Sequence, residues 1–266
     1  MSRILLASYG TDISVHLELA REFGGGLEIQ AFSQPAILDG DWQALLREYQ
    51  ELLRDFTGPL ACHGAFYDMA SATEDARIRQ LTWERYLHNL DIAATLGARH
   101  VIFHTNFLPM LRREGYRRLW IERQVDFWGE LSAEAAAREV RITLENMWDP
   151  DPLLLKGVMD ALDSPHVGVC LDVCHAFLYN NAHPIAEWLT ALAPYVWHVH
   201  MNNSRGVIDE HIGLNDPSGA IDYARLLPQL AALPHRPWLV LELDDPQVAA
   251  KSLNYTRRIL GDAFNT

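Results

Sequence analysis

Histidine and carboxylate side chains recur in this chain at one kind of place, the end of a short apolar segment. Residues 198–211, HVHMNNSRGVIDEH, begin as an alternating segment with His198 and His200, break into a polar loop, and return with Asp209 and His211. Neutral imidazole and carboxylate are the side chains that bind many divalent metal ions in proteins. The segment therefore indicates a metal site that receives ligands both from a strand end and from the loop after it.

The same pattern occurs in six successive apolar segments. Their terminal polar residues are His63, His104, Glu145, Asp172 with His175, His200 with Asp209 and His211, and Glu242. Any one of them could be an ordinary core or rim residue. Together they would be costly to bury unless a cation compensated their charge. We therefore predict that these nine residues hold metal, and that His198 supports the site without being a ligand.

Eight short apolar segments alternate with longer amphipathic ones, which predicts strands alternating with helices. The expected strands are 3–8, 26–32, 59–64, 99–105, 140–146, 167–173, 196–202 and 237–243. Eight such units favour a single α/β domain over 1–266, a (β/α)₈ TIM barrel, over an open doubly wound sheet. In such barrels the chemistry lies at the C-terminal ends of the strands, where the metal-binding residues are expected.

Composition limits the function classes. The 266 residues fit one barrel, and 22 Lys and Arg against 35 Asp and Glu give a net charge of −13. That charge disfavours nonspecific nucleic-acid binding. Three cysteines without a CxxC pair suggest a reducing compartment. The apolar segments are too short to cross a membrane and the N-terminus reads as a first strand, so we expect a cytoplasmic protein without membrane contact. The oligomeric state stays open.

These motifs resemble the xylose isomerase-like TIM barrel superfamily, which includes endonuclease IV and the sugar phosphate isomerases and epimerases. HGAF at 63–66, DVCH at 172–175, HMNN at 200–203 and DEH at 209–211 match its metal-binding motifs. Asn203 stands where the family often has Asp, and the first two apolar segments carry no motif of the family. The resemblance implies the barrel fold and the same nine metal ligands.

Our leading interpretation from the sequence is a multinuclear hydrolase. Two or three Zn²⁺ ions would activate a bridging water on a phosphoester, with Glu145 bridging the metals. Arg112 could bind phosphate and Phe66 could contact the substrate. We expect a small phosphorylated or sugar-like substrate, with endonuclease activity on abasic DNA a less favoured choice.

The alternative is a sugar or sugar phosphate isomerase or epimerase. It needs one Mn²⁺, Co²⁺ or Mg²⁺, held by Glu145, Asp172, His200 and Glu242, with the two glutamates acting as acid and base. Arg205, Asn202 and His175 would then contact the substrate. A third hypothesis is a barrel that binds a ligand without catalysis.

Overall fold

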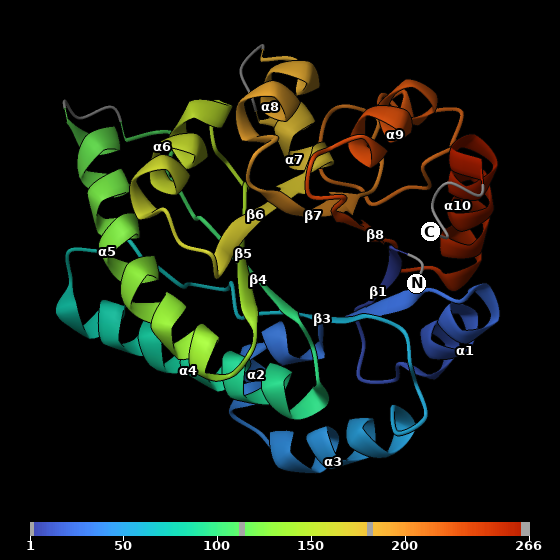
Figure 1. The fold of residues 1–266 in the computed structure, drawn as a ribbon, viewed down its shortest axis with the longest axis horizontal. Helices are drawn as coiled ribbons and strands as arrows, with labels where there is room; N and C mark the ends of the chain where they lie inside the picture. Colours follow the sequence, from blue (N-terminus) through green and yellow to red (C-terminus); the bar gives the residue numbers. More distant parts are fainter. Residues whose placement is uncertain (1–2, 112–114, 180–182, 262–266) are drawn as a thin grey trace.

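Eight parallel strands close into a barrel in the computed structural model, which describes residues 3–111, 115–179 and 183–261 (Figure 1). Each strand pairs with its sequence neighbours, and β1 pairs with β8 to close the sheet. The strands are β1 Ile4–Ser8, β2 Gly26–Ile29, β3 Leu60–His63, β4 His100–His104, β5 Arg141–Glu145, β6 Val167–Asp172, β7 Val196–Met201 and β8 Trp238–Leu241. The predicted TIM barrel is confirmed, and the open sheet is excluded.

Helices surround the barrel and return the chain from the end of one strand to the start of the next (Figure 1). They are α1 Ser14–Phe23, the short 3₁₀ helix η1 Ala31–Ser33, α2 Pro35–Leu38, α3 Trp42–Leu52, α4 Ala76–Leu96, α5 Tyr116–Ala137, α6 Pro152–Leu162, α7 Val173–Leu178, α8 Ile185–Leu192, α9 Tyr223–Ala231 and α10 Pro246–Leu260. Local sequence sets their ends: the Asp151 side chain accepts from Leu153 N at the start of α6, and Gly97, with φ of 74°, ends α4.

The barrel interior is apolar at one level and polar at another. Because strand side chains alternate, Leu5, Ala61, Ile102 and Val240 point inward and form a small separate cluster, while their neighbours pack outward against the helices. Buried polar residues from the C-terminal ends of the strands lie above this cluster. The fold thus brings the polar residues of the strand ends together at one end of the barrel.

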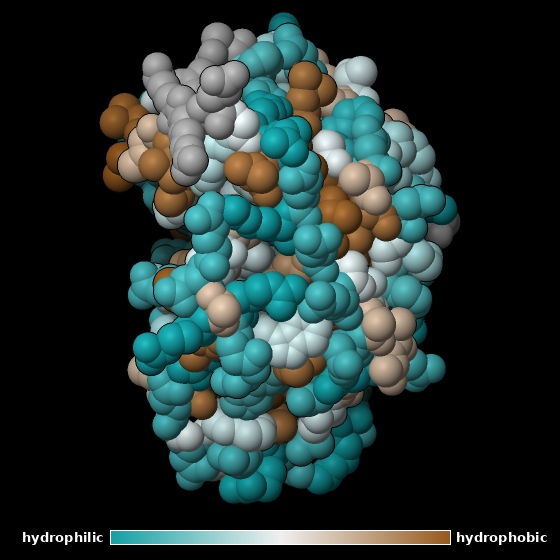
Figure 2. Space-filling model, turned by 90° about the vertical axis from the view of Figure 1, so that its left-hand side faces the viewer, coloured by the Kyte–Doolittle hydropathy of each residue, from teal (hydrophilic) through white to brown (hydrophobic). Residues whose placement is uncertain are grey.

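The outer surface on the side of α4, α5 and α6 is largely hydrophilic, with scattered apolar side chains (Figure 2). Such a surface is usual for helices that cover a barrel and face solvent. Within the described residues, no helix combines the length and apolar character needed to cross a membrane.

Candidate active site

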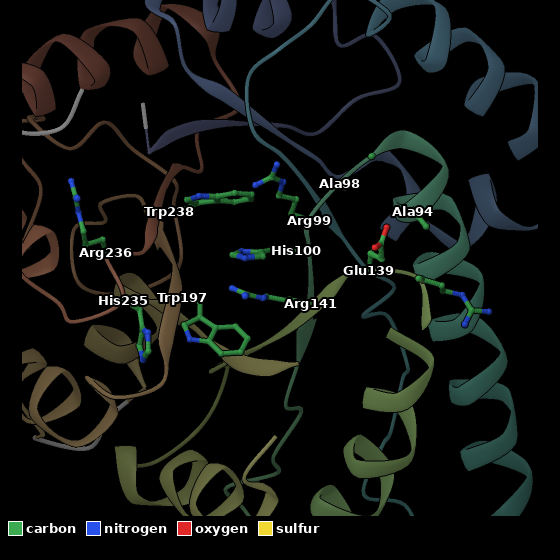
Figure 3. A pocket seen from close by; sticks show the side chains of 12 residues that line it. Ala94, Ala98, Arg99, His100, Glu139, Arg141, Trp197, His235, Arg236 and Trp238 are labelled. Carbon is green, nitrogen blue, oxygen red and sulfur yellow. The ribbon is translucent and has the colours of Figure 1, made fainter. Parts of the chain in front are cut away.

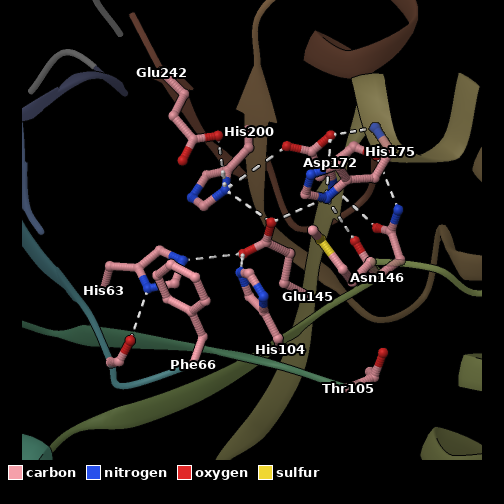
Figure 4. Close-up of polar contacts among 12 residues, drawn as sticks. His63, Phe66, His104, Thr105, Glu145, Asn146, Asp172, His175, His200 and Glu242 are labelled. Atoms are coloured by element: carbon pink, nitrogen blue, oxygen red, sulfur yellow. Dashed lines mark hydrogen bonds and ion pairs between the residues drawn. The ribbon is translucent and has the colours of Figure 1, made fainter. Parts of the chain in front are cut away.

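Glu145, the last residue of β5, lies at the centre of the polar cluster and is 1% exposed (Figure 4). Its Oε2 is 3.3 Å from Nε2 of His63 and 3.2 Å from Nε2 of His104. Its Oε1 is 3.3 Å from Nδ1 of His175 and 3.4 Å from Nδ1 of His200. The strand register explains this convergence, because His104 and Glu145 are paired residues of β4 and β5. Each oxygen of Glu145 therefore faces its own group of imidazoles.

A second group forms around His200 on β7. Its Nδ1 lies 3.4 Å from Oε1 of Glu145, 3.4 Å from Oε2 of Glu242 and 4.0 Å from Oδ2 of Asp172. Ligand atoms bound to one metal ion at about 2.1 Å are roughly 3.0–3.4 Å apart. Three carboxylates and one imidazole therefore converge with spacings close to those of a metal coordination sphere. We call these four residues the quartet.

The loop after β7 brings Asp209 and His211 back to the cluster. Oδ2 of Asp209 lies 3.2 Å from Nε2 of His175 and 2.9 Å from Nε2 of His211. Through His175, which also contacts Glu145, this group joins the others. All nine residues singled out in the sequence thus form one connected network.

Backbone carbonyls orient three of the histidines. A carbonyl oxygen only accepts hydrogen bonds, so a ring nitrogen beside it must carry the proton, which leaves the other nitrogen of the neutral ring as a free lone pair. Nδ1 of His63, His175 and His211 donates to the carbonyl oxygens of Gly64, Asn146 and Glu242 at 2.9, 3.0 and 3.0 Å. Each Nε2 then faces a carboxylate oxygen. Hydrogen bonding of one ring nitrogen while the other faces the site is typical of metal-binding histidines.

Several buried polar atoms of the cluster have no hydrogen-bond partner in the described chain. They are Oε2 of Glu145, Oδ2 of Asp172, Nδ1 of His200 and Oδ1 of Asp209. Unpartnered buried polar atoms are costly, and here they are all of types that ligate metals. The donor set fits a divalent cation.

The electrostatics of the cluster also fit a cation. Burial, together with the charges of Glu145 and Glu242, raises the pKa of Asp172 to about 7 against the attraction of His175. Burial would lower the pKa of His211, but its hydrogen bond to Asp209 and the charge of Glu242 raise it to about 9. The raised pKa values of Asp172 and His211 both reflect nearby carboxylate charge in a buried space, which a bound cation would neutralise.

Glu28, within β2, also belongs to the cluster, although no motif in the sequence predicted it. Its side chain is fully buried, and Oε2 lies 2.8 Å from Nε2 of His198 and 3.1 Å from Nε2 of His200. Gln30 donates one hydrogen bond to Glu28 at 3.1 Å and another to Glu242 at 3.0 Å. The sequence does contain an indication of this role, because Glu28 is an acidic residue at an inward-facing position of an otherwise apolar strand. His198 contacts Glu28 and lies below the quartet.

Besides His175, four residues are expected to contact substrate, and they lie in different settings. Phe66 stacks on His104, with ring centroids 4.7 Å apart, so it forms a wall of the site. Asn202 is fully buried and its amide has no partner in the described chain. Arg205 is exposed and pairs with Glu210.

Arg112 lies outside the described residues. The neighbouring Arg117 forms two 2.6 Å hydrogen bonds with Asp151, a surface ion pair and not a phosphate site.

The hydrogen bonds of Asn203 explain why an amide stands where the family motif often has Asp. Its amide nitrogen donates to the carbonyl of Ile221 at 3.0 Å, and its amide oxygen accepts from the backbone nitrogens of Ser204 and Ile221, each at 3.0 Å. A carboxylate could accept these bonds but could not donate to Ile221. The side chain closes the loop that carries Asp209 and His211.

Comparison with known proteins assigns the family. The family model described as xylose isomerase-like TIM barrel matches residues 17–259, and the chain belongs to this family. The TTHB071 protein of Thermus thermophilus, whose structure follows soaking with ZnCl₂, is 30% identical, with 98% of both chains covered and a TM-score of 0.79. The uncharacterized protein MJ1311 of Methanocaldococcus jannaschii is 25% identical over 80% of this chain and 74% of its own length.

Several solved structures with the same fold are named as sugar epimerases or epimerase-like proteins. A D-tagatose 3-epimerase-like protein has a TM-score of 0.80 at 20% identity, with 100% of this chain and 99% of the other covered. An L-ribulose 3-epimerase has a TM-score of 0.78 at 18% identity, covering 100% of this chain and 96% of the other. At these identities the likeness establishes the fold alone.

Proposed function

We propose that the protein is a divalent-metal-dependent isomerase or epimerase that acts on a sugar or sugar phosphate. This was the alternative interpretation of the sequence, and it now takes precedence over the zinc hydrolase. The observation that carries it is the placement of Glu145 and Glu242, which approach Nδ1 of His200 from opposite sides at 3.4 Å each (Figure 4). The names of the structural neighbours agree with it.

The two glutamates suit proton transfer at a carbon next to a carbonyl. One carboxylate removes the proton from that carbon, the electron pair of the C–H bond moves toward the carbonyl oxygen, and the other glutamate returns a proton to the opposite face. Burial opposes ionisation of Glu145, but His104 and His200 keep its pKa well below its usual value, so it stays available as a base. A divalent cation in the quartet would stabilise the charge that develops on the carbonyl oxygen.

Other residues position these groups. Gln30 holds Glu242 through a 3.0 Å hydrogen bond, and Glu28 fixes the ring of His200. His63 and His104 lie 3.3 and 3.2 Å from the second oxygen of Glu145. In this proposal Phe66 and Asn202 contact the substrate, and Phe66 keeps water away from the imidazoles that it covers.

Exchange of carbon-bound hydrogen with solvent tests the proposal. The metal-loaded protein would be incubated in D₂O with a panel of ketoses and their phosphates, and deuterium next to the carbonyl would be measured by NMR. We expect incorporation with at least one sugar, and its loss in both Glu145→Gln and Glu242→Gln. No incorporation across the panel, together with cleavage of a phosphodiester, would overturn the proposal.

A multinuclear hydrolase is the second candidate, and one observation favours it. The two oxygens of Glu145 face separate groups, His63 and His104 on one side and His200 on the other, as expected of a carboxylate that bridges two metals. In that case His104→Ala should abolish activity, whereas the isomerase should keep part of its turnover.

A further inference from the structure

A cavity of about 630 Å³ opens at the end of the barrel opposite the candidate active site (Figure 3). Residues at or next to the starts of strands line it, including His100 of β4, Arg141 of β5, Trp197 of β7 and Trp238 of β8. Its volume is within the range of small-molecule binding pockets. Neither the metal cluster nor the proposed reaction uses it.

The lining is strongly cationic in a protein with a net charge of −13. Four arginines and one acid contribute to it: Arg99, Arg138, Arg141, Arg236 and Glu139. Arg138 is already engaged, because it pairs with Asp91 and Glu134 and donates to the Glu134 carbonyl. The other three arginines form no ion pair and donate no side-chain hydrogen bond within the described chain.

These free arginines are not explained by helix capping. Helix C-termini lie at this end of a barrel, and arginine often satisfies their last carbonyls. Arg138 does so, but Arg99, Arg141 and Arg236 do not. A guanidinium presents several N–H donors in a planar arrangement that matches the oxygens of a phosphate. Three guanidiniums without an ion-pair partner in the described chain therefore make this cavity suitable for binding an anion.

The cavity floor keeps these charges in place. The Arg141 guanidinium carbon lies 5.1 Å from the ring centre of Trp197, and His100 stacks on Trp238 with centroids 4.2 Å apart (Figure 3). Burial, the neighbouring His198, and the charges of Arg141 and Arg99 hold the pKa of His100 well below its usual value. These ring contacts hold Arg141 and His100 against the floor, and Glu139 is the one acid among the lining residues. Because each tryptophan already has a protein group against its ring, recognition there rests on charge.

We propose that this cavity binds a small molecule bearing phosphate, at a site separate from the metal cluster. Arg99 and Arg141, at the starts of neighbouring strands, bind the phosphate oxygens, Arg236 adds positive charge across Trp238, and the remaining volume accommodates an organic group (Figure 3). Two or more negative charges on the ligand best match three guanidiniums.

Binding of ADP and of inorganic phosphate to the metal-loaded protein tests the site. Isothermal titration calorimetry should give one saturable site for ADP that weakens with added NaCl. The double substitution Arg99→Gln with Arg236→Gln should weaken binding at least tenfold, and both side chains are exposed, so the fold should persist. Tighter binding of ADP than of phosphate identifies an organic phosphate as the ligand; equal affinities identify free phosphate.

Matched variants separate binding in this cavity from a general effect of charge and from binding at the metal cluster. Arg47→Gln with Arg77→Gln removes the same charge from exposed positions elsewhere and should leave binding unchanged. Asp172→Asn alters the metal cluster and should also leave it unchanged. Absence of saturable binding, or equal weakening by both arginine pairs, would overturn the proposal. So would loss of binding in Asp172→Asn with retention in the Arg99 and Arg236 variant.

Discussion

Oε2 of Glu28 lies 3.1 Å from Nε2 of His200, and the other nitrogen of that ring faces Glu145 and Glu242. The carboxylate thus fixes both the orientation and the tautomer of the imidazole at the centre of the quartet. This arrangement of carboxylate, histidine and open ligand position is typical of metal sites, where such supporting residues affect affinity strongly.

Substitution of Glu28 should therefore weaken metal binding, although all four quartet residues stay unchanged. We expect Glu28→Gln to reduce affinity for the divalent ion roughly 10- to 100-fold, because the uncharged amide supports His200 less well. Competition with a coloured chelator measures this affinity. Glu22→Gln, at an exposed position on α1, is the control. Equal affinities in Glu28→Gln and the control would show that Glu28 plays no part in the site.

Asn203 should be required for the stability of the loop that carries Asp209 and His211. Asn203→Asp removes the donor to the Ile221 carbonyl and places a charge at a residue that is 1% exposed. We expect it to lower the free energy of unfolding by about 2 kcal/mol, measured by urea denaturation. Asn215→Asp, exposed in the same loop, should change it little. Similar effects of the two substitutions would argue against the assigned hydrogen bonds.

Asp149 should make stability depend on pH. It is buried, accepts from Thr105 Oγ1 at 2.8 Å, and burial raises its pKa to about 6. The folded state therefore holds a proton that the unfolded chain has released, so this residue's contribution to stability is greatest at low pH. That contribution is lost as pH rises through 6, by about 1 kcal/mol between pH 5 and 7.

The substitution Asp149→Asn removes this titration. Compared with wild type, the variant should lose less stability between pH 5 and 7 in urea denaturation. Asp126→Asn, exposed on α5, should retain the wild-type dependence. Parallel stability profiles for wild type and Asp149→Asn would contradict the raised pKa.

Much of the candidate site could be predicted from the sequence, because the C-terminal ends of parallel strands lie together at one end of the barrel. The placement of His104 and Glu145 at the candidate site could be predicted from the sequence, because each ends its strand, and the structure pairs the two residues. Glu28 could not, because it lies within β2 and its role depends on His198 and His200, 170 and 172 residues away in sequence. The cavity lined by Arg99 and Arg141 could not be predicted from the sequence either, because the residues at strand starts form no recognisable motif.

The number of metal ions tests the central claim most directly. Elemental mass spectrometry on protein purified without chelator or affinity metal should find one divalent ion per chain, kept in His104→Ala and lost in Asp172→Asn, because only Asp172 belongs to the quartet. Two or three zinc ions per wild-type chain, with at least one lost in His104→Ala, would contradict the isomerase and establish a multinuclear centre.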